Sequence, residues 1–182
     1  MSVTSAPFGL RPSYSPSGVV RPTAYSIDPT YATTIYQNQP VKLVDGNLEA
    51  AAVGNRFIGT FQGVEWTDTD GRRRISNKWS AQSGATEIVA YSTLDPSIVY
   101  EVQSNATMDA ATIGGQYDFT AASGNTTTGI SSQMLDVASI ANNAAFRVIG
   151  ITPGPDNAWG DNYVIVQVQI SEHQNVADIA DY

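Results

Sequence analysis

The chain lacks cysteine and has a single histidine, His173, among its 182 residues. Without cysteine, neither a disulfide framework nor thiolate chemistry is available. One histidine excludes a metal site built from several histidines and leaves few ways to pair a nucleophile with a base. Because His173 follows the last predicted strand, we expect it on the surface without a catalytic role. These absences argue against metal, thiol or histidine catalysis.

Charge is also scarce. Charged residues make up 14% of the chain, with 17 acidic against 9 basic side chains, whereas about 25% is typical of soluble domains. Phosphate binding needs clustered Lys and Arg, so we expect no nucleic acid as partner. No apolar run approaches the roughly 20 residues that span a bilayer, and the N-terminus shows no export signal. The sequence therefore predicts a soluble protein with no membrane partner.

The charges that are present are unevenly distributed. Residues 1–78 hold eight basic and six acidic side chains, a net charge of +2, whereas residues 79–182 hold one basic and eleven acidic, a net charge of −10. A basic face in the first part could dock on an acidic partner surface. Chance scatter explains the asymmetry equally well, and both interpretations stay open.

Turn signals in the first half of the chain predict a rigid β scaffold. Residues 41–44, VKLV, are mostly apolar and extended, and Asp45-Gly46-Asn47 tolerates positive φ, which indicates a hairpin. The next predicted strand, residues 57–66, carries Gly59 and Gly63 on one face. Two glycines four residues apart in a strand indicate bulges, or another backbone lying close by.

A second hairpin is predicted around Asp70-Gly71, which would form a two-residue loop before a strand over residues 72–79. The predicted pairs are Thr69 with Arg72, Asp68 with Arg73, Trp66 with Ile75 and Glu65 with Ser76. The stretch Asp68-Thr69-Asp70-Gly71 also resembles a fragment of a calcium loop. The hairpin explains it better, because a third ligand and a distal Glu are missing and Arg72–Arg74 would oppose the cation.

Residues 1–34 contain five closely spaced prolines and no strand alternation, which predicts an extended arm. Unlike most disordered tails, this segment is rich in large apolar side chains that need a place to be buried. We expect it to lie on a sister subunit or another partner, although packing on its own domain or a floppy tail are alternatives. The candidate partner contacts are Phe8, Leu10, Arg11, Tyr14, Arg21, Tyr25 and Tyr31 in the arm, and Arg72 and Arg74 in the hairpin.

The second half adds further predicted strands. Residues 87–91, 98–102 and 146–151 each read as a strand, and Tyr163–Ser171 alternates apolar side chains on one face as a central strand would. Residues 130–136 fit a strand better than the alternative short helix, since their neighbours are strands. A pattern shared by residues 51–57 and 111–117 suggests a diverged repeat of 35–96 and 97–171, with coincidence at least as good an explanation.

These observations predict a mainly β fold. Its body, residues 35–171, would be a compact β-barrel or β-sandwich of short antiparallel strands, flanked by the N-terminal arm, residues 1–34, and a C-terminal tail, residues 172–182. The sequence contains no P-loop and no dinucleotide fingerprint. We therefore assign no catalytic, cofactor-binding or metal-binding residue and expect the protein not to be an enzyme.

Two functional alternatives rest on the tryptophans and carboxylates. Trp66, Trp79 or Trp159 could form a stacking platform for a host glycan, as in a tail or fibre protein. A glycosidase would instead use Glu65 with a second carboxylate such as Asp68. Core packing explains Trp66 more simply, and the sequence does not give the distance between two carboxylates.

Several motifs together resemble a known family. They are APFGLRP at residues 6–12, QPVKL at 39–43, GNRFIGTFQGV at 54–64, the DTDGR turn at 68–72, FRVIG at 146–150 and PDNAWGDNYVIVQV at 155–168. This pattern resembles capsid decoration (cement) proteins of tailed bacteriophages. The resemblance implies a β-rich body that assembles as a homotrimer on the outer capsid surface of the virion, after synthesis in the bacterial host cytoplasm. Its partners would be the major capsid protein and itself, and it would stabilise the capsid by bridging neighbouring capsomers through arms. On that basis we expect a body lacking residues 2–34 to fold but not to bind capsids.

Overall fold

The computed structural model describes residues 3–82 and 84–176, which form a mainly β structure with two antiparallel sheets. Sheet I contains, in spatial order, β1 (Arg11–Tyr14), β8 (Val99–Gln103), β11 (Ile165–Ile170), β10 (Phe146–Ile151) and β9 (Gln116–Tyr117). Sheet II contains β2 (Pro22–Tyr25), β7 (Thr86–Thr93), β5 (Gly59–Thr67), β3 (Pro40–Val44) and β4 (Asn47–Ala50), and β6 (Arg73–Ser76) pairs with β5. Two short 3-10 helices, η1 (Ala110–Thr112) and η2 (Val137–Ser139), lie in the loops around sheet I.

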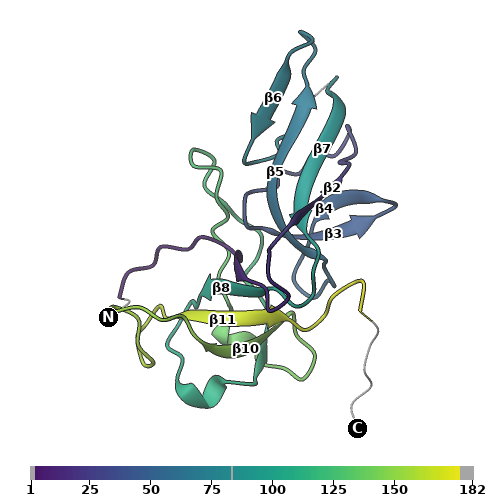
Figure 1. The fold of residues 1–182 in the computed structure, drawn as a ribbon. Helices are drawn as coiled ribbons and strands as arrows, with labels where there is room; N and C mark the ends of the chain where they lie inside the picture. The colour runs from purple at the N-terminus through teal and green to yellow at the C-terminus, as the bar shows by residue number, and fades with distance from the viewer. Residues whose placement is uncertain (1–2, 83, 177–182) are drawn as a thin grey trace.

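The two sheets lie at opposite ends of an elongated molecule (Figure 1). Each has its own hydrophobic core: Phe57, Phe119 and Phe146 pack edge-on or tilted in the core of sheet I. Trp66 and Trp79 pack edge-to-face in the core of sheet II. The mainly β prediction is thus confirmed, whereas a closed barrel is not formed within the described residues.

The strand predicted to be central in the second half is central. β11 lies between β8 and β10, and Val164, Val166, Val168 and Ile170 are all buried in the core of sheet I. Side chains of a strand alternate between the two faces, so this period-2 pattern was sufficient to identify the buried face.

The first hairpin of sheet II also follows the sequence prediction. Asp45 and Gly46 both have positive φ, 48° and 82°, and the pair Val44–Asn47 closes the turn. Positive φ at both central positions is the type I′ geometry that matches the twist of paired strands. At Gly59 another backbone does lie close by, because an added Cβ would sit 2.1 Å from the carbonyl oxygen of Thr93.

The predicted register of the second hairpin is wrong by one residue. Glu65 pairs with Ile75 and Trp66 with Arg74, so Ile75 faces solvent instead of packing against Trp66. The loop is one residue longer than expected: the Asp68 amide donates to the Arg72 carbonyl, and Gly71, with φ of 77°, ends the turn. A turn followed by a left-handed glycine is the usual three-residue hairpin loop, and a one-residue slip exchanges the two faces of the strand.

The N-terminal segment is not a free arm over its described length. β1 pairs with β8 at the edge of sheet I, and β2 pairs with β7 at the edge of sheet II. Leu10 and Ile27 are buried in the two separate cores. The apolar side chains of this segment are therefore largely accommodated by the chain itself, because each sheet offers an edge with unpaired backbone groups.

Residues 130–136 form neither the predicted strand nor the alternative helix. They are extended and make isolated bridges, such as Leu135 with Ser104 and with Phe119, before η2 begins. The proposed repeat of 35–96 and 97–171 stays a prediction. Of the predicted C-terminal tail, residues 172–176 pack on the body, and residues 177–182 lie outside the described residues.

The two sheets meet at a polar junction that contains His173. The prediction that this histidine lies on the surface is wrong, since it is 3% exposed. Its Nε2 lies 3.1 Å from the Leu94 carbonyl oxygen, and its Nδ1 accepts from the Asn175 amide at 3.1 Å. Burial lowers the pKa of His173, which keeps the ring neutral. His173 is buried because it forms an isolated bridge with Phe57, which lies in the core of sheet I.

Candidate functional site

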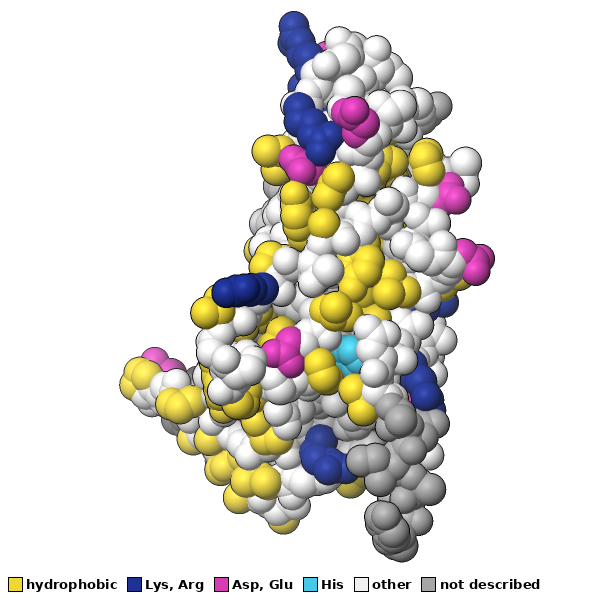
Figure 2. Space-filling model, turned by 45° about the vertical axis from the view of Figure 1, so that its right-hand side comes forward, with side chains coloured by type: hydrophobic (Ala, Val, Ile, Leu, Met, Phe, Trp, Pro, Cys, Tyr) yellow, Lys and Arg dark blue, Asp and Glu magenta, His cyan; other side chains and the backbone are white. Residues whose placement is uncertain are grey.

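The charged cluster of the molecule lies on the β5–β6 hairpin at the far end of sheet II (Figures 1 and 2). Arg74 contacts the carboxylates of Asp68 at 3.3 Å and Asp70 at 3.1 Å, and Arg72 lies 3.7 Å from Asp70. The charges predicted to face an acidic partner are therefore partly balanced within the hairpin itself. Exposed pairs of this kind add little to stability, about 0–1 kcal/mol each.

One apolar residue of this hairpin is strongly exposed. Ile75 lies in β6 and is 81% exposed. Within the described residues β6 pairs with β5 alone, so its outer edge carries backbone groups without a neighbouring strand. An exposed edge with a large apolar side chain is a site where another chain can bind. We call residues 65–76 the hairpin end.

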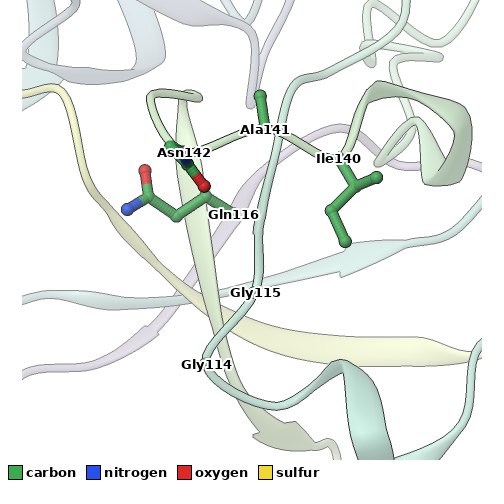
Figure 3. A pocket seen from close by; sticks show the side chains of 6 residues that line it. All are labelled: Gly114, Gly115, Gln116, Ile140, Ala141 and Asn142. Atoms are coloured by element: carbon green, nitrogen blue, oxygen red, sulfur yellow. The ribbon is translucent and has the colours of Figure 1, made fainter.

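A second exposed apolar site lies at the opposite end of the molecule, around η1 and the loop after η2 (Figure 1). Ile113 is 50% exposed and Ile140 is 65% exposed. Beside them is a hollow of about 360 Å³, shown in Figure 3. It is lined by Gly114, Gly115, Gln116, Ile140, Ala141 and Asn142. We call Ile113 and this lining the basal end.

The basal end is held in place by hydrogen bonds to sheet I. The Gly114 amide donates to the Val148 carbonyl at 2.8 Å, and the Gln116 side-chain oxygen accepts from the Ala144 amide at 3.2 Å. Gly114 has φ of 90°, which favours glycine at this turn. The hollow is therefore a fixed feature of the backbone, with Ile140 on its rim.

The predicted N-terminal contacts are brought into two different places. Near sheet I, Phe8 is half-buried beneath the Arg11 guanidinium, 4.7 Å from its ring centroid, and Arg11 forms an ion pair with Glu101. Leu10 is buried in the core, so its side chain has no surface left for a partner. Tyr14 is exposed at the end of β1.

The remaining predicted contacts of the segment lie near sheet II. Tyr25 and Tyr31 are half-buried against its core. The Tyr31 hydroxyl accepts from the Ala50 amide at 2.9 Å, and its carbonyl accepts from the Trp79 indole at 3.2 Å. Arg21 is exposed just before β2. Of these three, Arg21 has the side chain most available to another molecule.

The tryptophan platform and the carboxylate pair do not fit their predicted roles. Trp66 and Trp79 are buried against each other, which leaves no ring face for a sugar, and Trp159 packs partly against the core of sheet I. Glu65 accepts from the Tyr91 hydroxyl at 2.8 Å and contacts Arg73 at 3.2 Å. Arg73 and then Tyr91 lower the pKa of Glu65, whereas a general acid requires a raised pKa.

Within residues 3–82 and 84–176, no group of three or more His, Cys, Asp or Glu side chains is arranged to hold a metal ion. No helix in this part of the chain is long and apolar enough to cross a membrane.

The exposed isoleucines at the two ends were not identified from the sequence. The wrong hairpin register placed Ile75 on the core face. A three-residue loop that ends at Gly71 would have placed Ile75 on the outer face. Ile113 and Ile140 lie in loops whose packing no periodicity predicts. No family model, curated protein or solved structure matches this chain.

Proposed function

We propose that this chain is a virion structural protein that binds the outer surface of a tailed-phage capsid and stabilises it by bridging neighbouring capsomers as a homotrimer. The observation that carries the proposal is the presence of exposed isoleucines at both ends of an elongated molecule. A bridging protein needs two separated binding sites on a rigid body, and large exposed apolar side chains are typical of binding sites.

Each end would supply a different kind of contact. The hairpin end presents the unpaired edge of β6 with the exposed Ile75, which suits an extended segment of the major capsid protein that carries an apolar side chain. The basal end presents the exposed Ile140 beside a largely polar hollow, which suits a partner that packs an apolar side chain on Ile140 and hydrogen-bonds to Gln116 or Asn142. Contacts that are weak singly bind tightly together when three copies engage at once. The resemblance of the sequence motifs to those of capsid decoration proteins points to the same proposal.

The proposal is tested with Ile75→Asp and Ile140→Asp in capsids assembled without this chain. Both side chains are exposed, so we expect each substitution to change the free energy of unfolding by less than about 0.5 kcal/mol. Each should lower capsid occupancy in a sedimentation assay and reduce the temperature at which the capsids open. Val53→Asp is the matched control, because Val53 is exposed outside both ends.

Unchanged occupancy for both isoleucine variants would contradict the proposal. If only Ile75→Asp loses binding, the protein attaches to the capsid through the hairpin end and does not bridge capsomers. Sedimentation equilibrium of the free protein measures the oligomer, and a monomer at all accessible concentrations would contradict the homotrimer in solution.

A glycan-binding tail or fibre protein is disfavoured by the buried Trp66 and Trp79 rings, and binding of the isolated protein to host glycans would restore it.

A further inference from the structure

The chain contains two Asp-Gly pairs, and both lie in hairpin turns of sheet II. Asp45-Gly46 joins β3 to β4, and Asp70-Gly71 joins β5 to β6. An Asp-Gly pair is a place where a backbone can rearrange to isoaspartate, because glycine has no side chain to hinder attack by its own amide nitrogen. The rearrangement proceeds most easily where the aspartate carboxyl and the glycine amide make no other contact. The two turns differ in this respect.

Both reacting groups of the pair in the β5–β6 hairpin are engaged. One oxygen of the Asp70 carboxylate accepts from the Arg72 amide at 3.0 Å, and the other accepts from the Arg74 guanidinium at 3.1 Å. The Gly71 amide donates to the Asp68 carbonyl at 2.9 Å. These hydrogen bonds have to break before the amide nitrogen can reach the carboxyl carbon, so this turn opposes the rearrangement.

The same groups in the β3–β4 hairpin are not engaged. Asp45 is exposed, and within residues 3–82 and 84–176 its carboxylate forms no hydrogen bond or ion pair. The Gly46 amide likewise donates to no group in the described part of the chain. Asp45 has φ of 48°, a left-handed conformation that is strained for a residue with a side chain, so rotation of the backbone out of it relieves strain. Figure 1 shows this hairpin projecting from the side of sheet II, and a Cβ built on Gly46 would meet no atom within 4 Å.

We propose that Asp45 is a site of spontaneous isoaspartate formation, whereas Asp70 is protected by the contacts of its own turn. In the first step the Gly46 nitrogen attacks the protonated side-chain carboxyl of Asp45. The amide proton and the carboxyl hydroxyl leave as water, and a cyclic imide forms. Water then adds to the main-chain carbonyl of the imide, and the bond between that carbonyl carbon and the nitrogen breaks. The chain now runs through the Asp45 side chain, and the former main-chain carbonyl is a free carboxylate. One water is released and one is taken up, so the rearrangement needs no oxidant, reductant or cofactor.

The product would weaken β4 at the edge of sheet II. Isoaspartate adds one carbon atom to the main chain inside a two-residue loop, which the Val44–Asn47 pair closes. Just beyond the loop, Leu48 is buried in the core of sheet II, and its amide donates to the Ser26 carbonyl at 2.8 Å. The length and geometry of a hairpin loop fix the strand register, so the longer main chain should displace Leu48. The modified chains should therefore unfold at a lower urea concentration. This inference does not depend on capsid binding.

The test compares the two sites within the same full chain. The protein is incubated in mildly acidic buffer and digested with trypsin, which places the sites in separate peptides, residues 43–56 and 57–72. Mass spectrometry with electron-transfer fragmentation distinguishes isoaspartate from aspartate in each peptide. We expect isoaspartate at Asp45 to accumulate at least about tenfold faster than at Asp70, the factor that one or two hydrogen bonds add to a barrier. In concentrated guanidinium chloride, where neither turn is formed, both sites should convert at similar rates.

Two variants serve as controls. Asp45→Glu should remove the signal from its peptide, because the larger ring that glutamate would have to form closes far more slowly. Arg74→Gln frees one oxygen of the Asp70 carboxylate, so it should speed conversion at Asp70 and leave Asp45 unchanged.

Equal rates at the two sites of the folded chain would overturn the inference, as would faster conversion at Asp70. Conversion of Asp45 in guanidinium chloride alone would also overturn it, because the folded β3–β4 turn would then be protective. If Arg74→Gln leaves the rate at Asp70 unchanged, the protection assigned to the contacts of that turn is wrong.

Discussion

Replacing Leu10 with alanine tests whether the N-terminal segment belongs to the body or is a detachable arm. The Leu10 side chain is 1% exposed and lies in the core of sheet I. Its amide donates to the Asn38 carbonyl at 2.8 Å, and a Cβ on the preceding Gly9 would lie 2.6 Å from that same oxygen. The backbone here has little room to collapse into a cavity.

These contacts set the expected magnitude. Leu→Ala substitutions in tightly packed cores cost about 2–5 kcal/mol, and the cost rises when the cavity stays open. We therefore expect Leu10→Ala to lower the free energy of unfolding by about 3 kcal/mol. With a typical urea dependence of about 2 kcal/mol/M, the midpoint would fall by about 1.5 M.

Urea unfolding followed by far-UV circular dichroism measures this change, because the method reports on both sheets. Val19→Ala is the matched control, since Val19 belongs to the same segment and is exposed, and it should change stability by less than about 0.5 kcal/mol. If Leu10→Ala is as mild as the control, the segment is an arm that the body does not need. The strands β1 and β2 lead us to expect the opposite, and a chain lacking residues 2–34 should fail to fold.

Three further predictions concern the backbone and the pH dependence of stability. Gly59→Ala should cost more than about 3 kcal/mol, since its Cβ would overlap the Thr93 carbonyl, whereas Gly150→Ala, with open space around it, should be nearly neutral in thermal melts. As the pH falls below about 6.5, the unfolded chain takes up a proton that the buried, neutral His173 resists, so stability should decline, and His173→Gln should flatten this part of the pH profile. Hydrogen bonds, led by that from Ser97, lower the folded pKa of Asp95 to about 2, so the stability that it contributes should be lost as the pH falls from about 4 towards 2, and Asp95→Asn should lack that loss. If the pH profile of either variant, His173→Gln or Asp95→Asn, equals that of the wild type, the role assigned to that residue is wrong.

The expectations from sequence succeeded where a local pattern was sufficient. The alternating valines of residues 164–170 identified the buried face of β11, and Asp45-Gly46 identified a type I′ turn. Both signals depend on a few neighbouring residues, because side-chain alternation and positive φ are properties of the local backbone.

The candidate site was less predictable, because it depends on contacts between distant segments. Proline spacing indicated an extended N-terminal segment, but it did not reveal that β8 and β7 offer edges for that segment to join. Pairing of this kind is decided by unpaired backbone groups far away in the sequence. The exposure of Ile75 was missed for a related reason, since one additional loop residue exchanges the faces of a strand.

The sequence by itself determined a mainly β chain without cysteine chemistry, with its hairpin turns and its central strand in place. The tertiary structure decided which side chains are available to other molecules. It buried Leu10, Trp79 and His173 and left Ile75 and Ile140 exposed. The physical reason is that local backbone preferences specify strands and turns, whereas burial depends on which strands meet and on how the two sheets share one junction.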